Sequence, residues 1–254
     1  PARQSGDKNK ATPGIRKLAR ELDIDLSIVG ATGADGQITE NDIQRAAATL
    51  SVVEPAQQLR GIRKSMAMRM AQAHAEVVPA SLGDEANITA WVKGSDATLR
   101  LVEAMVAACE SVPALNAWFE SNTQSLRVLQ RVDLGMAVDT EDGLMVPVVA
   151  NADKLDLLQI SKESKKLAES ARRGISASRE PGTFSISNVG MFGVDVLPII
   201  NPPEAAILGV GKTTEQLRPF KGGIFTRQIM SLSLSVDHRA VDGALAAQFL
   251  SRLT

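Results

Sequence analysis

The first fifty residues carry hydrophobic positions at the spacing of two short helices. Thr12 followed by Pro13 is a helix-start signal, with Thr12 as the expected N-cap and Pro13 at the first helical position. Apolar residues then recur at helical spacing, at Ile15, Leu18, Ala19 and Leu22. A second helix is expected to begin at Thr39, after a loop with the glycines Gly30, Gly33 and Gly36. The pattern predicts a small all-α domain at residues 11–47, near the lower size limit for independent folding, and such a module more often docks than catalyses.

From Leu59 onward the pattern alternates between helical periodicity and short β-branched runs. Helices are expected at residues 63–75, 97–111 and 153–171. Strands are expected at residues 130–138, 145–149, 183–188, 205–210 and 229–236. Strands interleaved with helices argue for an α/β domain with a mixed sheet, which we place at residues 58–254. Polar stretches at residues 1–10 and 48–57 are interpreted as linkers.

Composition then excludes several classes of function. The chain has 28 basic and 29 acidic residues, so no global field favours nucleic acid or an acidic membrane surface. No apolar run approaches the roughly 18 residues that span a bilayer. With one cysteine and two histidines, neither a disulfide framework nor a protein-built zinc site is expected, and Cys109 is interpreted as part of a buried helix in a reducing compartment. Because the chain opens with Pro1 and has no signal peptide, we expect it to be a piece of a longer protein.

The most informative segment for chemistry is SLSLSVDHRAVDG. An alternating strand delivers His238 at its end, and Asp242 lies four residues later with Arg239 between them. A histidine beside acidic and basic neighbours can serve as a general base near neutral pH. The alternative is a surface histidine in a turn held by local salt bridges, and the short motif alone does not decide between them. The other histidine, His74, ends an amphipathic helix and is interpreted as structural or solvated.

A second segment, GTFSISNVGMFG, places hydroxyl groups at a strand end beside glycines. Ser185 and Ser187 share strand parity, so both side chains are expected on the same face of the sheet. A hydroxyl at such a position can donate a hydrogen bond to a developing oxyanion. Taken alone, serine and asparagine there are more often turn formers. Parity does not choose between them, although Ser187 lies at the strand end, next to Asn188 and the glycine loop.

Three blocks in order, TFSISNVGMFG, PIINPPEAAILGVG and DHRAVDG, resemble the catalytic domain of 2-oxo acid dehydrogenase complex acyltransferases. LGMAVDTEDGLMVPVV and RKSMAMRMAQAH are also similar, and the resemblance covers nearly all of residues 59–254. The first domain resembles the family's peripheral subunit-binding domain, whose pattern is matched by Pro13, Arg16 and Ala19. It departs from that pattern at Ala31, which replaces a glycine, and at Gln37, which replaces an arginine.

The resemblance implies a chloramphenicol acetyltransferase-like catalytic domain with a mixed sheet. Its reaction is acyl transfer between dihydrolipoyl and coenzyme A thiols, with coenzyme A as a substrate and the lipoyl group carried on a lipoyl domain that is not in this chain. His238 is expected to be the general base and Ser187 the oxyanion donor. Asp242 is expected to orient the histidine loop through Arg239. The GMFG and DHRAVDGA forms are most similar to acetyl-transferring members, while succinyl and branched-chain transfer stay open.

The resemblance also implies partners and an assembly. Arg16 and Arg20 are expected to contact an acidic partner, which is dihydrolipoamide dehydrogenase, the 2-oxo acid decarboxylase component or both. Ser187 and His238 are expected to meet between neighbouring subunits of a homotrimer, and a larger cage stays open because the family continues past Thr254. The implied compartment is the bacterial cytoplasm or the mitochondrial matrix. Two alternatives remain: a stand-alone acetyltransferase of the same fold, which would have no docking domain, and a non-catalytic tethering subunit, which would be expected to lose His238.

Overall fold

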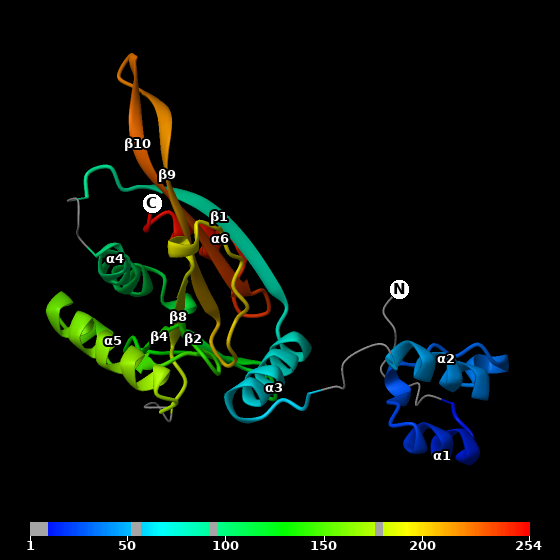
Figure 1. Cartoon of the computed structure of the whole chain (residues 1–254). Coiled ribbons are helices and arrows are strands. Elements are labelled where there is room, and N and C mark those ends of the chain that lie inside the picture. Colours follow the sequence, from blue (N-terminus) through cyan, green and yellow to red (C-terminus); the bar gives the residue numbers. More distant parts are fainter. Residues whose placement is uncertain (1–9, 52–56, 92–95, 176–179) are drawn as a thin grey trace. The chain divides into compact units, whose positions relative to one another are not determined.

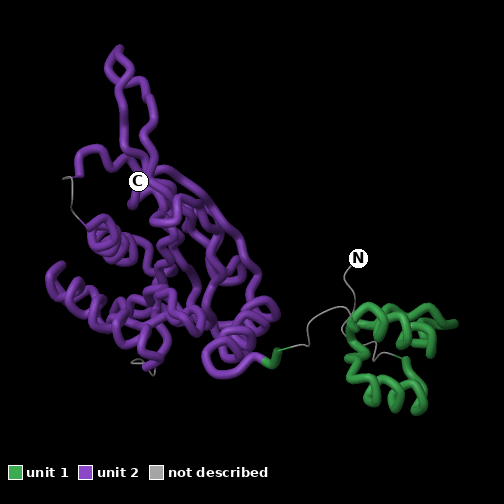
Figure 2. The backbone as a smooth tube through the Cα atoms, viewed as in Figure 1, with its two compact units in different colours: residues 1–58 green, residues 59–254 purple. Residues whose placement is uncertain are grey.

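The computed structural model describes residues 10–51, 57–91, 96–175 and 180–254. They belong to two compact units, residues 1–58 and 59–254 (Figure 2). Within the described residues, no helix is both long and apolar enough to cross a membrane.

The first unit is built from two helices, α1 (Pro13–Glu21) and α2 (Glu40–Leu50), joined by two short 3-10 turns. Thr12 caps α1 by accepting a hydrogen bond from the Ile15 N–H, which confirms the expected helix start. Thr39 likewise caps α2, in a capping box with Asp42. Buried apolar side chains from both helices and the loop form one small core: Ala19, Ile24, Val29, Ile38 and Ile43.

Helix α2 continues to Leu50, into the stretch 48–57 that the sequence assigns to a linker. Alanines 46–48 favour helix, and the Ser51 N–H still donates to the Ala47 carbonyl. The linker expectation is therefore wrong for residues 48–50. Residues 52–56 and 1–9 of the two expected linkers lie outside the described residues.

The second unit has a six-stranded sheet with the order β1-β10-β9-β8-β4-β7. The strands are β1 (Pro79–Asn87), β10 (Gly223–Asp237), β9 (Ala206–Phe220), β8 (Phe184–Asn188), β4 (Leu134–Met136) and β7 (Val148–Val149). Strand β8 runs parallel to both of its neighbours, β4 and β9, whereas the other pairs are antiparallel. Two small hairpins are separate, β2 (Ala117–Glu120) with β3 (Ser125–Val128) and β5 (Val138–Thr140) with β6 (Gly143–Met145). The expected mixed α/β architecture is confirmed.

Four helices complete this unit: α3 (Gly61–Glu76), α4 (Ala97–Ser111), α5 (Leu157–Arg172) and α6 (Gly243–Leu250). Figure 1 shows α4 and α5 next to each other on one side of the sheet, and they are in contact. Side chains of α4 and α6 share one core with the apolar face of the sheet, where the Phe249 ring stacks on Phe184 at 5.2 Å. Cys109 of α4 is buried in this core, as expected, and burial raises the pKa of its thiol to about 12.

The two faces of the sheet differ in chemistry. Phe184 and Ile186 of β8 point into the core, and alternation then sends Ser185 and Ser187 to the opposite face. On that face Ser185 pairs with Gly135 on one side and with Ile207 on the other, and Ser187 pairs with Gly209. Helices α4, α5 and α6 cover the apolar face, and the candidate hydroxyls lie on the other one.

Several elements differ from the sequence-based expectation. Strand β4 covers only three residues of the expected strand 130–138, because residues 130–133 are held by side-chain hydrogen bonds such as that from the Asn151 N–H to Asp133. Helix α5 begins at Leu157, not at 153, because Asp156 caps it. Strands β9 and β10 extend far beyond the expected 205–210 and 229–236 and form the hairpin that projects from the sheet in Figure 1.

Candidate active site

His238 is the first residue after strand β10. Its backbone N–H donates to the Val78 carbonyl, and the preceding Asp237 N–H donates to the Ala205 carbonyl, so both sides of the strand end are fixed. The ring Nδ1 lies 3.0 Å from the Val241 carbonyl oxygen. A carbonyl can only accept, so Nδ1 carries the hydrogen and Nε2 keeps its lone pair. The residue is exposed, which leaves Nε2 able to take a proton from a substrate.

The acidic and basic neighbours of His238 have different partners from those expected. Arg239 binds the buried Asp237, with Nη2 at 2.6 Å from Oδ2, and its guanidinium lies 4.3 Å above the ring of Phe119. The expectation that Asp242 acts through Arg239 is therefore wrong. Asp242 instead caps α6, with Oδ1 accepting from the Leu245 N–H at 2.9 Å. It closes the turn that carries Val241, the acceptor for the histidine ring.

The two candidate serines of β8 differ in what their hydroxyls contact. Ser185 is 1% exposed and donates to the Glu204 carboxyl at 2.9 Å. Ser187 is partly exposed, and within the described residues its hydroxyl has no hydrogen bond. The next residue, Asn188, donates to Thr98 at 3.1 Å and accepts from the Gly190 N–H at 3.0 Å, which fixes the strand end. Ser187 is therefore the hydroxyl that remains available to a ligand.

Within one chain, Ser187 and His238 are far apart. Ser187 is level with Gly209 on β9, and Gly209 is level with Ser233 on β10. His238 lies five residues beyond Ser233, which corresponds to about 17 Å along the strand direction, and β8 and β10 are about 10 Å apart across the sheet. The structure therefore does not bring the two predicted groups together inside one subunit.

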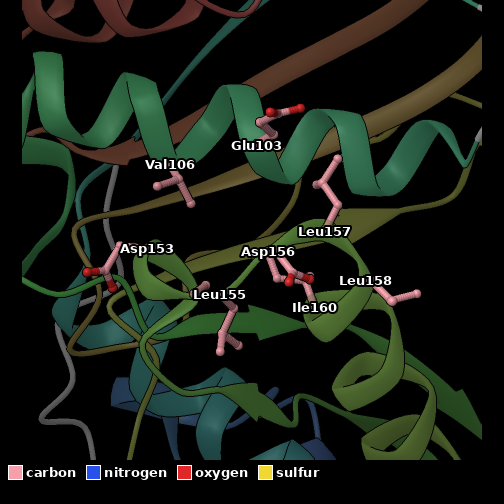
Figure 3. Close-up of a pocket in the computed structure, with 9 residues that line it drawn as sticks. Glu103, Val106, Asp153, Leu155, Asp156, Leu157, Leu158 and Ile160 are labelled. Carbon is pink, nitrogen blue, oxygen red and sulfur yellow. The ribbon is translucent and has the colours of Figure 1, made fainter.

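Two cavities of the second unit have linings that include neither Ser187 nor His238. One of about 590 Å³ opens between α4 and α5 and is lined by Glu103, Val106, Leu157 and Leu158 among others (Figure 3). A second of about 290 Å³ lies beside Thr98. Among the described residues, no cluster of histidine, cysteine and carboxylate side chains could hold a metal ion. His74 is exposed in the last turn of α3.

In the first unit, Arg16 and Arg20 are exposed and lie four residues apart on α1. The Arg16 Nε donates to the Ala11 carbonyl, and the Arg20 Nε donates to the Arg16 carbonyl. The two departures from the family pattern, Ala31 and Gln37, are also exposed.

Sequence reasoning missed three parts of this region: the Val241 carbonyl, the Asp237 carboxylate and Glu204. A backbone acceptor leaves no sequence signal. Glu204 left little signal either, because a glutamate is ordinarily exposed, even directly before an apolar run such as AAILGV.

Comparisons with known proteins identify the two domains. Residues 53–254 match the family model of the 2-oxoacid dehydrogenases acyltransferase catalytic domain, and residues 9–44 match that of the e3 binding domain. The chain is 32% identical to the dihydrolipoyllysine-residue acetyltransferase component of the pyruvate dehydrogenase complex of Mycoplasma capricolum, over 96% of this chain and 67% of that protein. It is 34% identical to the corresponding component of the acetoin cleaving system of Bacillus subtilis, over 97% of this chain and 68% of that protein.

A solved structure of the Azotobacter vinelandii dihydrolipoamide acetyltransferase aligns with a TM-score of 0.72 and 32% identity, over 79% of this chain and 90% of that chain. That structure concerns the role of a serine, a histidine and an asparagine in the catalytic mechanism of the enzyme.

Proposed function

Because the chain belongs to the acyltransferase family of 2-oxoacid dehydrogenase complexes, we propose that it transfers an acetyl group between dihydrolipoyl and coenzyme A thiols. His238 is the general base and Ser187 the oxyanion donor. The observation that carries this assignment is the hydrogen bond between the His238 Nδ1 and the Val241 carbonyl, because it directs the basic Nε2 outward. The free hydroxyl of Ser187 supports the second role.

The reaction needs no covalent intermediate on the protein. Nε2 of His238 takes the proton of the coenzyme A thiol, and the thiolate attacks the carbonyl of the acyl-dihydrolipoyl thioester. The tetrahedral intermediate carries a negative oxygen, to which the Ser187 hydroxyl donates. When the carbon–sulfur bond breaks, the imidazolium returns a proton to the leaving dihydrolipoyl sulfur. The same groups serve the reverse direction.

Asp242 acts on the histidine turn by capping α6. In the Azotobacter enzyme the asparagine under study lies four residues beyond the histidine, the same separation as between His238 and Asp242. Aspartate and asparagine are both good N-caps, so either residue can hold the turn.

The first unit is proposed to dock dihydrolipoamide dehydrogenase through Arg16 and Arg20, because residues 9–44 match the e3 binding domain. The 2-oxo acid decarboxylase component is the second candidate, since Gln37 stands where the family has an arginine. The proposed compartment is the cytoplasm, because several relatives are bacterial; the mitochondrial matrix is the alternative, because another relative is mitochondrial.

The test is an acyl-transfer assay with free dihydrolipoamide and acetyl-, succinyl- and isobutyryl-coenzyme A. The highest kcat/KM is expected with the acetyl thioester, and His238→Ala serves as the control for the site. A preference for another thioester would correct the acyl group alone. Absence of transfer with every thioester, in a folded protein, would favour the non-catalytic tethering subunit.

A further inference from the structure

Glu204 is a buried carboxyl to which acyl transfer assigns no step. It is 1% exposed and lies two residues before the first residue of strand β9. Its Oε1 accepts from the Ser185 hydroxyl at 2.9 Å and from the Asn201 amide at 3.3 Å. Within the described residues, Oε2 has no hydrogen-bond partner and no cation is paired with the carboxyl. The carboxyl is buried and, in the described part of the chain, meets only the neutral donors Ser185 and Asn201. Because burial disfavours its charged form, the pKa of Glu204 is raised to about 7.

Glu204 and its chain neighbour contact both strands that carry candidate catalytic groups. Its partner Ser185 is two residues before Ser187 on β8, on the same face of the sheet. Its chain neighbour Ala205 accepts from the Asp237 N–H, one residue before His238. The hydrogen bond to Ser185 is thus a side-chain contact between β8 and the segment that enters β9.

Two glycines make room for this contact. A Cβ at Gly182 would lie 3.0 Å from the Glu204 Oε1, and a Cβ at Gly135 would overlap the Ser185 hydroxyl. Side chains at these positions would displace either the carboxyl or the serine. The local sequence therefore keeps open the space in which Ser185 and Glu204 meet.

We propose that Glu204 is a positioning residue for acyl transfer, which through Ser185 fixes strand β8 and so the place of the Ser187 hydroxyl. The proposal rests on the oxyanion role of Ser187. An oxyanion donor must stand within hydrogen-bond distance of where charge develops, and a displacement of about 1 Å can cost about 100-fold in rate. Glu204 itself touches no reacting atom.

The experiment compares Glu204→Leu, which removes the acceptor, with Glu204→Gln, which keeps an oxygen for Ser185. Each is made in the wild-type chain and in a Ser187→Ala chain, and kcat and KM are measured for acetyl transfer. Glu204→Leu is expected to lower kcat by about 10- to 100-fold with little change in KM, because the contact acts on the transition state. Glu204→Gln is expected to stay within about threefold of wild type.

The Ser187→Ala background separates positioning from general damage. If Glu204 acts through Ser187, then Glu204→Leu costs no further kcat once the hydroxyl is gone. An equal loss in both backgrounds, or an equal loss for Gln and Leu, would overturn the positioning role alone. A Ser187→Ala enzyme with normal kcat would overturn the oxyanion assignment and this proposal with it. If Glu204→Leu does not fold, Ser185→Ala replaces it, with the same pattern expected at a smaller loss.

Discussion

The two histidines of the chain differ in what their rings contact. The Nδ1 of His238 is held by the Val241 carbonyl in a turn that both Asp242 and the Asp237–Arg239 pair stabilise. His74 lies exposed on α3, whose side chains are mostly solvent-exposed. A base must be held in one orientation and one tautomer to take a proton efficiently. Only His238 meets this condition.

His238→Ala is expected to lower kcat by about 10²–10⁴, the usual range for a lost general base. The melting temperature should change little, because the side chain is exposed and not part of the core. His74→Ala is the matched control and should keep wild-type kcat. Steady-state acetyl transfer with both variants checks this, and near-normal transfer by His238→Ala would remove the residue from the mechanism.

Ser187→Ala is expected to lower kcat by about 10²–10³ with a smaller effect on KM, because the hydroxyl acts mainly in the transition state. Ser185→Ala should cost far less, because that hydroxyl is buried and binds Glu204. Kinetics of the two variants under the same conditions decide between them. A larger loss for Ser185→Ala would show that the oxyanion donor has been misplaced by two residues.

Glu204 also makes the stability of the second unit depend on pH. Its pKa rises from an ordinary 4.5 to about 7, so the folded state binds the proton more tightly than the unfolded state. Below about pH 4.5, ionisation of Glu204 does not lower the free energy of unfolding. As pH rises through 7, it lowers the free energy of unfolding by on the order of 3 kcal/mol. Two other buried carboxyl side chains of this unit, Asp133 and Asp237, are paired with Arg131 and Arg239.

Glu204→Gln, which cannot ionise, should therefore gain stability relative to wild type as pH rises from 5 to 8. Urea unfolding of both proteins at the two pH values measures this difference, and the wild type cancels the titration of other groups. A difference between the two proteins that is the same at both pH values would contradict the shifted titration.

At the scale of elements, helices could be predicted more closely than strands. Helix α4 coincides with the expected 97–111, because an apolar run follows the Asp96 cap. Strand β1 was missed, since PASLGDEAN lacks β-branched residues and is extended only because all nine positions pair with β10. The outer halves of β9 and β10 pair mainly with each other and bury little, so they carry no core signal. Local sequence cannot show pairing of this kind.

Helix α1 allows a test of docking. Arg16→Glu is expected to abolish binding of dihydrolipoamide dehydrogenase, because a reversed charge would repel an acidic patch, while transfer to free dihydrolipoamide stays unchanged. Lys17→Glu is the matched control: it makes the same charge change next to Arg16 but points about 100° around the helix. Titration calorimetry at increasing salt measures both, and affinity should fall with salt. Salt-independent binding that tolerates Arg16→Glu would exclude this surface.

At the scale of the whole molecule, the register of the sheet decides where a complete site can form. His238 and Ser187 could each be predicted from a strand end, but their distance depends on which strands pair and at which positions. The pairing of Ser187 with Gly209 and of Gly209 with Ser233 separates them by about 17 Å along the strands. One hydroxyl and one imidazole at such a distance cannot act on the same thioester. The proposed function therefore requires a second copy of the chain, and a closed head-to-tail trimer gives three equivalent sites.

A His238→Ala protein and a Ser187→Ala protein should then restore activity when they assemble together. In randomly mixed trimers, each site needs an intact His238 from one chain and an intact Ser187 from the next. Each is present with a probability of about one half, so roughly a quarter of wild-type activity should return. The two variants are unfolded together, refolded and assayed, with each refolded alone as the control and native mass spectrometry to show mixed trimers. If both residues acted within one chain, no mixed trimer would hold an intact site, and activity would stay at the level of the single variants.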